Sequence, residues 1–214
     1  MSTWGIVVAG GAGNRFGTAK QFESIAGARL VDRAVEATAA TCDDVVIVLP
    51  DGVSWDGPRV SAAVAGGATR SASVRAGLDA VAESATIVVV HDAARPVAST
   101  ELFNAVIDAV RGGADAAVPA LPVPDTVKRV DGDHVLETVA RDGLVTVQTP
   151  QAFQARALRA VHATGDDATD DAALIEAAGG RVVVVPGDPA NLKVTTQADL
   201  GVAAALLAAT RESS

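Results

Sequence analysis

Short apolar runs alternate along this chain with longer amphipathic stretches. The apolar runs are rich in valine and alanine and lack polar alternation, which is typical of strands buried on both faces of a parallel sheet. The longer stretches repeat apolar residues at helical spacing, and one of them follows the capping pair Ser99 and Thr100. Strands are predicted at residues 5–9, 45–49, 60–65, 86–90, 116–119 and 181–185, and helices at 30–40, 71–82, 101–110, 155–163, 170–178 and 197–209.

This alternation predicts an α/β fold, with a Rossmann-like, mostly parallel sheet and helices on both of its faces. The length of 214 residues suits a single domain over residues 1–214, with a frayed tail at 210–214. The rhythm breaks between Pro119 and Pro150. There, two short segments, 125–130 and 134–139, flank a polar turn at 131–133, which predicts a protruding two-stranded β-arm at about 121–148. An isolated hairpin is only marginally stable, so we expect it to pack against another surface, such as a second subunit.

Composition and charge narrow the classes of function. The formal net charge of −9 argues against a nucleic-acid surface, although it does not exclude small anionic substrates. No run of 18 apolar residues is present, so no transmembrane helix is expected, and the N-terminal residues lack the basic start of a signal peptide. Cys42 is the only cysteine, which favours a reducing cytoplasm and a structural role for this thiol.

The most informative motif follows the strand predicted first. Five glycines lie within residues 5–17, Arg15 stands among them, and Lys20 follows closely. Glycine allows backbone N–H groups to approach an anion, and the two cations supply countercharge, so the loop predicts a phosphate site. A Walker loop would need a terminal Gly-Lys-Ser/Thr, which is absent. A dinucleotide fingerprint would need its third glycine one residue earlier than Gly17.

A second motif, His91-Asp92-Ala93-Ala94-Arg95-Pro96, ends another buried strand. Ligands of open α/β sheets bind at the carboxyl ends of strands, so this motif is expected beside the phosphate loop. A carboxylate there can hold Mg²⁺ while phosphates and water complete the coordination, and we assign that role to Asp92. His91 is interpreted as a structural histidine.

The remaining candidate motifs are individually weak. The segment 66–73 reads as the start of a helix with a serine cap, whose amides and Ser73 could also contact a base or ribose. The segment 168–172 reads as a Thr169 cap followed by acidic residues. Segments 125–128 and 149–151 are plain surface motifs when each is taken alone, and so is Arg141. Lys193, before the last helix, either faces the site or solvent.

Taken together and in order, these motifs resemble the cytidylyltransferase family of the methylerythritol phosphate pathway to isoprenoids. The resemblance runs from about Ile6 to Leu207 and is carried most strongly by the motif at residues 91–96. It implies a nucleotidyltransferase-type fold and transfer of CMP from CTP to 2-C-methyl-D-erythritol 4-phosphate, with release of pyrophosphate. It also implies a Mg²⁺ cofactor and a homodimer in which the arm reaches the neighbouring subunit's site.

The same resemblance assigns roles to individual residues. Catalytic roles fall to three cations, Arg15, Lys20 and Lys193. The loop and helix-start residues expected to bind CTP are Ala9, Gly10, Gly11, Ala12, Gly13, Gly67, Ser73 and Ala93. The residues expected to bind the polyol phosphate are Arg95, Thr126, Arg141 and Thr169, and Asp92 is the expected metal ligand.

Four positions depart from the family pattern. Val8 and Ala19 stand where the family usually has proline, and Gly10 stands where it has alanine. These three changes loosen the phosphate loop without removing a charge. Ala68 replaces a common acidic residue, and its loss removes a possible contact to the base.

Several other functions compete with this reading. A relative acting on another polyol phosphate, such as ribitol 5-phosphate, would share the CTP half of the site. A sugar-1-phosphate nucleotidyltransferase would be expected to have a longer loop and a further C-terminal domain. A nucleotide-sensing module without turnover would not need Arg15, Lys20 and Asp92 together. A dehydrogenase would need a dinucleotide-binding fingerprint, which this sequence lacks.

Overall fold

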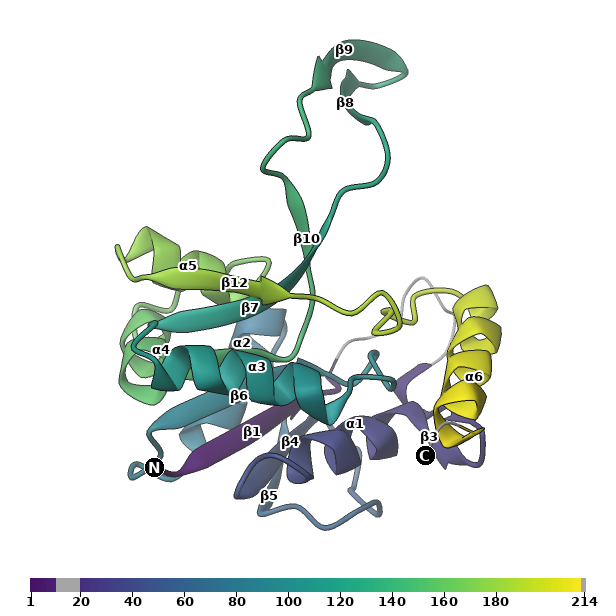
Figure 1. Cartoon of the computed structure of the whole chain (residues 1–214). Coiled ribbons are helices and arrows are strands. Elements are labelled where there is room, and N and C mark those ends of the chain that lie inside the picture. The colour runs from purple at the N-terminus through teal and green to yellow at the C-terminus, as the bar shows by residue number, and fades with distance from the viewer. Residues whose placement is uncertain (11–19, 213–214) are drawn as a thin grey trace.

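The computed structural model describes residues 1–10 and 20–212, and it forms a twisted sheet flanked by helices (Figure 1). The strands of the main sheet are β1 (Thr3–Val8), β4 (Asp44–Leu49), β5 (Ala62–Ala65), β6 (Ile87–Asp92), β7 (Ala116–Pro122), β10 (Val145–Val147), β11 (Gln151–Gln154) and β12 (Val182–Pro186). The helices are α1 (Leu30–Ala39), α2 (Arg70–Asp79), α3 (Thr100–Arg111), α4 (Ala155–His162), α5 (Asp171–Ala177) and α6 (Gln197–Glu212). A short helix η1 (Lys20–Phe22) and the small strand pair β2 (Ser24–Ile25) and β3 (Ala28–Arg29) lie between β1 and α1.

The sheet order confirms the prediction of a mostly parallel α/β fold. Within the described chain the order is β10-β7-β11-β6-β1-β4-β5, and β12 also pairs with β7. The strands β6, β1, β4 and β5 pair in parallel, as do β7 and β12. The strand β11 is antiparallel and separates β6 from β7. The chain leaves β1 toward β4 on one side while β6 lies on the other, so the strand order reverses at β1 and β6.

Successive residues of the central strands face opposite layers of helices. Ile6 of β1 lies in a buried cluster with residues of α2, α4 and α5. Its neighbour Val7 lies in a cluster with α1. On that same face, the strands β6, β11 and β7 contact α3. Both faces are therefore covered, which is why the central strands have no polar alternation. None of the helices in the described part of the chain is long and apolar enough to cross a bilayer.

The helix α2 packs so closely on the sheet that Gly77 has no room for a side chain. A Cβ there would lie 2.7 Å from Ile6 Cγ2 and 2.9 Å from Val48 Cγ2. We expect Gly77→Val to lower the free energy of unfolding by about 1–3 kcal/mol, because overpacking forces the helix away from β1 and β4. Urea unfolding would measure the loss. The matched control is Gly201→Ala in α6, where the added Cβ meets nothing within 4 Å.

Gly201→Ala should leave stability unchanged or raise it by about 0.5–1 kcal/mol, because alanine is the better helix former. Equal stability of Gly77→Val and the native chain would contradict the close packing of α2.

Several boundaries differ from the sequence predictions. The helix predicted at 71–82 ends at Asp79, and the strand predicted at 60–65 begins at Ala62. The strand predicted at 116–119 continues to Pro122, and the last helix continues to Glu212 where a frayed tail was expected. The strands β10 and β11 were not predicted, because each is short and they lie in a stretch punctuated by proline.

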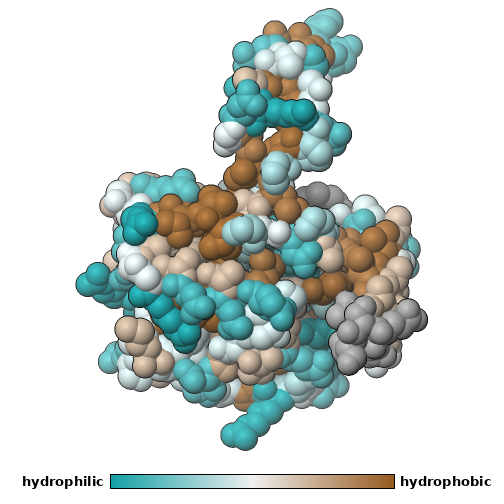
Figure 2. Space-filling model, viewed as in Figure 1, coloured by the Kyte–Doolittle hydropathy of each residue, from teal (hydrophilic) through white to brown (hydrophobic). Residues whose placement is uncertain are grey.

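Between β7 and β10 the chain forms a hairpin that stands away from the sheet (Figure 1). Its strands β8 (Val127–Asp131) and β9 (His134–Val139) pair with each other and with no other strand of the described chain. Their side chains are largely exposed, including Val130, Val135 and Leu136 at 57–61%. Figure 2 shows apolar side chains along this excursion, which we call the arm (residues 123–144).

Candidate functional site

The carboxyl ends of β1, β5 and β6 meet at one edge of the sheet. Ala9 N donates to Val48 O, Gly66 N donates to Leu49 O, and Ala93 N donates to Val8 O. These bonds align the segments that follow the three strands side by side. The edge lies where the strand order reverses, which is where open α/β sheets bind ligands.

Gly10, Gly66 and Ser73 form a closely packed cradle at this edge. A Cβ on Gly10 would lie 3.3 Å from Ser73 Oγ, and one on Gly66 would lie 2.8 Å from it. Ser73 Oγ accepts a hydrogen bond of 3.2 Å from Gly67 N. The structure thus brings together the predicted CTP-binding residues Gly10, Gly67 and Ser73. The start of α2 is capped by Thr69, which accepts from Ala72 N, and not by the serine expected from the sequence.

Asp92, at the end of β6, lies between two cations. Lys193 Nζ is 2.6 Å from Asp92 Oδ2, and Arg70 Nε is 3.7 Å from Asp92 Oδ1. Burial alone would raise the pKa of Asp92, but Lys193 and Arg70 outweigh it and lower the pKa to about 2. Asp92 is therefore ionised at neutral pH, and Lys193 faces the site rather than solvent alone.

Three sets of hydrogen bonds hold the segment that carries Lys193. Val194 N donates to Ala94 O, and Val194 O accepts from Lys20 Nζ at 2.8 Å. The carboxylate of Asp199 accepts from the backbone N–H groups of Thr195 and Thr196, which lowers the pKa of Asp199 to about 2. Lys20 and Lys193, which lie near opposite ends of the chain, are thereby joined through adjacent residues of one segment.

His91 is a structural histidine, as interpreted from the sequence. Its ring is fully buried against Phe103, with Nε2 3.1 Å from Arg95 O and Nδ1 3.2 Å from Thr149 Oγ1. Thr149 Oγ1 in turn accepts from Asp92 N. The imidazole therefore holds the turn from residue 91 to 95 and fixes the backbone that carries Asp92.

Arg95 is also buried, at 9% exposed. Its Nη1 donates to Asn191 O at 2.7 Å, while its Nε is buried without a partner. Burial lowers the pKa of Arg95, and Asp92 opposes that shift. A buried guanidinium nitrogen without a partner is costly, and an anionic ligand would satisfy it.

Burial of His91 makes stability depend on pH. Desolvation lowers its pKa from 6.5 to about 4, so between these values the unfolded chain binds a proton that the folded chain does not. The stabilisation is fully present above pH 6.5 and is lost as the pH falls toward 4. The shift corresponds to about 3 kcal/mol in the free energy of unfolding. Urea unfolding at about pH 7 and about pH 4 should show this loss.

His91→Gln should remove most of this pH-dependent difference, whatever it does to stability at neutral pH. His134→Gln, at an exposed histidine of the arm, is the matched control and should leave the difference unchanged. An unchanged difference in His91→Gln would contradict the assignment.

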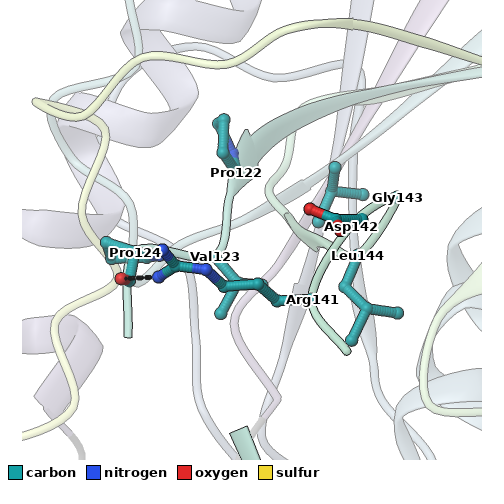
Figure 3. Close-up of a pocket in the computed structure, with 8 residues that line it drawn as sticks. Pro122, Val123, Pro124, Arg141, Asp142, Gly143 and Leu144 are labelled. Atoms are coloured by element: carbon teal, nitrogen blue, oxygen red, sulfur yellow. Dashed lines mark hydrogen bonds between the residues drawn. The ribbon is translucent and has the colours of Figure 1, made fainter. Parts of the chain in front are cut away.

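Two of the residues expected to bind the polyol phosphate lie where the arm leaves the body. Thr126 is exposed, and Arg141 Nη1 donates to Pro124 O. Arg141 lines an open pocket of about 460 Å³ with Pro122, Asp142 and Leu144 (Figure 3). The guanidinium reaches across this pocket toward Pro124, while Asp142 and Leu144 lie on its other side. Among the contacts of the described residues, Arg141 is bonded to Pro124, whereas Asp92 is paired with Arg70 and Lys193.

Thr169 is exposed and does not cap α5. The cap is Asp170, whose carboxylate accepts from Ala173 N. The sequence suggested Thr169 because it precedes the acidic pair, but the helix begins one residue later. Gly11, Ala12, Gly13, Arg15 and the departure at Ala19 lie outside the described residues.

Comparison with known proteins adds to this geometry. The sequence profile of the IspD family, 2-C-methyl-D-erythritol 4-phosphate cytidylyltransferase, matches residues 4–209. A protein of that name from Rubrobacter xylanophilus is 39% identical, over 95% of this chain and 94% of its own. The crystal structure of the Thermus thermophilus protein of that name is 35% identical, with a TM-score of 0.83 over 94% of this chain and 97% of that one.

The chain belongs to the 2-C-methyl-D-erythritol 4-phosphate cytidylyltransferase family. The resemblance inferred from the motifs is therefore confirmed, as is the fold class. Some relatives are longer. A bifunctional IspD/IspF enzyme from Clavibacter michiganensis subsp. michiganensis is 45% identical over 95% of this chain but only 54% of its own length. The chain thus spans about half the length of the bifunctional members of this cytidylyltransferase family that it matches.

One part of the site in this family member was not among the predicted site residues. Arg70 Nη1 forms a 2.7 Å ion pair with Asp171 Oδ2, and Asp171 Oδ1 is 2.9 Å from His162 Nε2. Burial opposes the charge on Asp171, but His162 and Arg70 lower its pKa. Arg70 and Asp171 are 101 positions apart in the chain. The only available signal was the presence of Arg70 and Asp171 in two of the family-like motifs.

Proposed function

We propose that this chain transfers CMP from CTP to 2-C-methyl-D-erythritol 4-phosphate, giving 4-diphosphocytidyl-2-C-methyl-D-erythritol and pyrophosphate. The observation that carries the proposal is the sheet edge itself. There a glycine and serine cradle lies beside an ionised Asp92 and the cations Lys193 and Arg70. Membership of the family supplies the identity of both substrates.

The chemistry needs no protein nucleophile. An oxygen of the 4-phosphate attacks the α-phosphorus of CTP in line and forms the new P–O bond. The bond from the α-phosphorus to the bridging oxygen of the β-phosphate breaks, and that oxygen leaves with pyrophosphate. Negative charge grows on the α-phosphate and the leaving group, so well-placed cations accelerate the reaction by electrostatic stabilisation.

Lys20 and Lys193 are the described cations proposed for this role, and Arg15 is the third. The backbone at Ala9, Gly10 and Ala93, with Gly67 and Ser73, is proposed to hold the nucleotide. Ala9 is supported by Gln21, whose Nε2 donates to Ala9 O at 2.7 Å. Gly11, Ala12 and Gly13 are also proposed to bind CTP. Arg95, with its unpartnered Nε, is proposed to contact the acceptor phosphate.

We further propose that the reaction uses Mg²⁺ held by Asp92. No group of three or more histidine, cysteine or acidic side chains gathers as a metal site within residues 1–10 and 20–212. A single ionised carboxylate still fits Mg²⁺, which commonly takes one or two carboxylates and completes its shell with phosphate and water. When bound, the ion would neutralise phosphate charge. Lys193 Nζ, now on Asp92 Oδ2, would then need to move from that oxygen.

The arm is proposed to act between two subunits of a homodimer. Its exposed apolar residues and its separation from the sheet support a role outside its own subunit. Thr126 and Arg141 would then bind the polyol phosphate in the partner's site, with Thr169 nearby. A cytoplasmic location is also proposed. It is supported by the single cysteine, whose thiol is buried with its pKa raised by burial to about 12.

The proposal is tested by pyrophosphate release from purified protein with CTP and Mg²⁺. Methylerythritol 4-phosphate and ribitol 5-phosphate are offered in parallel reactions. Release with methylerythritol 4-phosphate alone is the expected result. Release with ribitol 5-phosphate alone would keep the CTP chemistry and overturn the acceptor. Absence of release with both would favour a nucleotide-binding module.

A further inference from the structure

A continuous chain of polar and charged side chains runs from the interior to the sheet edge. It begins at His162 in α4, whose Nε2 is 2.9 Å from Asp171 Oδ1 at the start of α5. Asp171 Oδ2 lies 2.7 Å from Arg70 Nη1 at the start of α2. Arg70 Nε is 3.7 Å from Asp92 Oδ1, and Asp92 Oδ2 is 2.6 Å from Lys193 Nζ. The helices α4, α5 and α2, the end of β6 and the segment of Lys193 are therefore linked by one network of side-chain contacts.

Stability alone does not account for Asp171. Its side chain is fully buried, and so is nearly all of His162, at 0% and 2% exposed. Removing a charge from water is costly, and apolar residues of similar volume often replace buried ion pairs without loss of stability. The buried pair therefore indicates a role in which the orientation of the charged side chains matters.

The geometry indicates what that role is. An arginine side chain has many rotamers, and a single partner 3.7 Å away would fix it poorly. Asp171 holds Nη1 of Arg70 at short distance and is itself held by His162. The guanidinium of Arg70 is thereby directed so that its Nε faces Oδ1 of Asp92. Arg70 and Lys193 therefore pair with different oxygens of the Asp92 carboxylate.

We propose that Asp171 is a positioning residue, which holds the Arg70 guanidinium and, through it, the orientation of the Asp92 carboxylate in the site. Its effect on turnover rests on the proposed function, whereas its effect on Arg70 does not. Asp171 reaches no ligand itself, because its side chain is fully buried. A purely structural role, in which Asp171 only ties α5 to α2, would affect folding and leave Arg70 and turnover unchanged in the folded protein.

The test compares Asp171→Asn with a matched control, Asp167→Asn. Asp167 also pairs with an arginine of α2, since Arg75 Nη2 is 3.4 Å from its Oδ1, but this pair is on the surface. Both changes remove one negative charge and keep an oxygen acceptor. Thermal unfolding of each variant identifies any that does not fold. If Asp171→Asn does not fold, His162→Asn replaces it, because it removes the neighbour of Asp171 Oδ1 and keeps the Arg70 contact.

The first readout is the NMR signal of Arg70 Nε–Hε, assigned by its loss in Arg70→Lys, in the protein without ligands. The signal should show an ordered side chain in the native protein and in Asp167→Asn. It should show a mobile side chain in Asp171→Asn, and a partial change in His162→Asn. An equally ordered Arg70 in the folded Asp171→Asn or His162→Asn protein would overturn the proposal. This readout stands even if the proposed function fails.

The second readout is turnover with CTP and the acceptor that supports pyrophosphate release. Asp171→Asn should lower kcat about 10- to 100-fold, because small displacements of site groups have effects of that size. In an Arg70→Gln background, adding Asp171→Asn should change kcat less than about twofold, since coupled residues are not additive. Independent, multiplicative losses would overturn the proposed action through Arg70. An inactive native protein would instead contradict the proposed function, and the NMR readout would then decide this inference alone.

Discussion

Replacement of Lys193 by alanine is expected to lower kcat for pyrophosphate release by about 10²- to 10³-fold. Lys193 Nζ is the closest cation to Asp92 among the described residues, and its segment also receives Lys20 through the bond to Val194 O. The variant removes a charge that would stabilise the reacting phosphates, and it leaves Asp92 with Arg70 at the longer distance. Steady-state kinetics with saturating CTP, Mg²⁺ and methylerythritol 4-phosphate would measure the loss.

The matched control for Lys193→Ala is Arg111→Ala. Arg111 is an exposed cation at the end of α3 whose ion-pair partner is Asp108 in the same helix. Arg111→Ala also removes one positive charge, but on the surface at the end of α3. Its kcat should therefore stay within about twofold of the native value, as for most surface substitutions. A rate for Lys193→Ala close to that of the control would contradict the proposed role of Lys193.

Replacement of Arg141 by alanine is expected to lower kcat/KM for the polyol phosphate about 100-fold, because a charge-assisted contact to phosphate is lost. The affinity for CTP should not change, since Arg141 lies at the base of the arm and not at the sheet edge. Kinetics at varied acceptor and calorimetry with CTP separate the two effects. The control is Arg129→Ala, an exposed arm arginine paired with Glu137, which should behave as the native protein.

Mixing the two variants tests whether the arm serves the partner subunit. Arg141→Ala has an intact body and Lys193→Ala has an intact arm. If the arm acts across a twofold dimer, random exchange gives half mixed dimers with one native site each, hence about a quarter of native activity. If the arm acts on its own subunit, the mixture should be no more active than the separate variants. That result would contradict the proposed action of the arm on the partner's site.

The sequence predicted the site at the sheet edge because strand ends are read from local pattern. Apolar runs ending at Ala9, Ala65 and Val90 place the residues that follow them at one edge of a parallel sheet, and the structure does so. The position of Gly10 beside Ser73 follows from that topology. The alternation of strand and helix was therefore enough to predict the fold class and this half of the site.

Other features depend on contacts that no local pattern encodes. The strand β11 has four residues, follows a proline and runs directly into α4, so its central antiparallel place in the sheet had no signal of its own. The contact of Arg70 with Asp171 joins residues far apart in the chain, and each has an ordinary explanation at the start of a helix. Arg141 and Thr126 were predicted from the resemblance, and the bond of Arg141 to Pro124 at the base of the arm could not be.

The two strands that flank the arm, β7 and β10, are neighbours in the sheet. Val145 of β10 is paired with Pro122 of β7, and Val147 is paired with Ala120. The pairing of β7 with β10 therefore brings the two ends of the arm together, and it does not involve the residues 123–144 between them. Since the entropy cost of closing a loop rises only slowly with its length, the length and sequence of the arm can change while the sheet edge around Asp92 stays as it is. On the proposal that Thr126 and Arg141 bind the acceptor, exchange of residues 123–144 would change the contacts from the arm to the acceptor without changing the fold of the sheet.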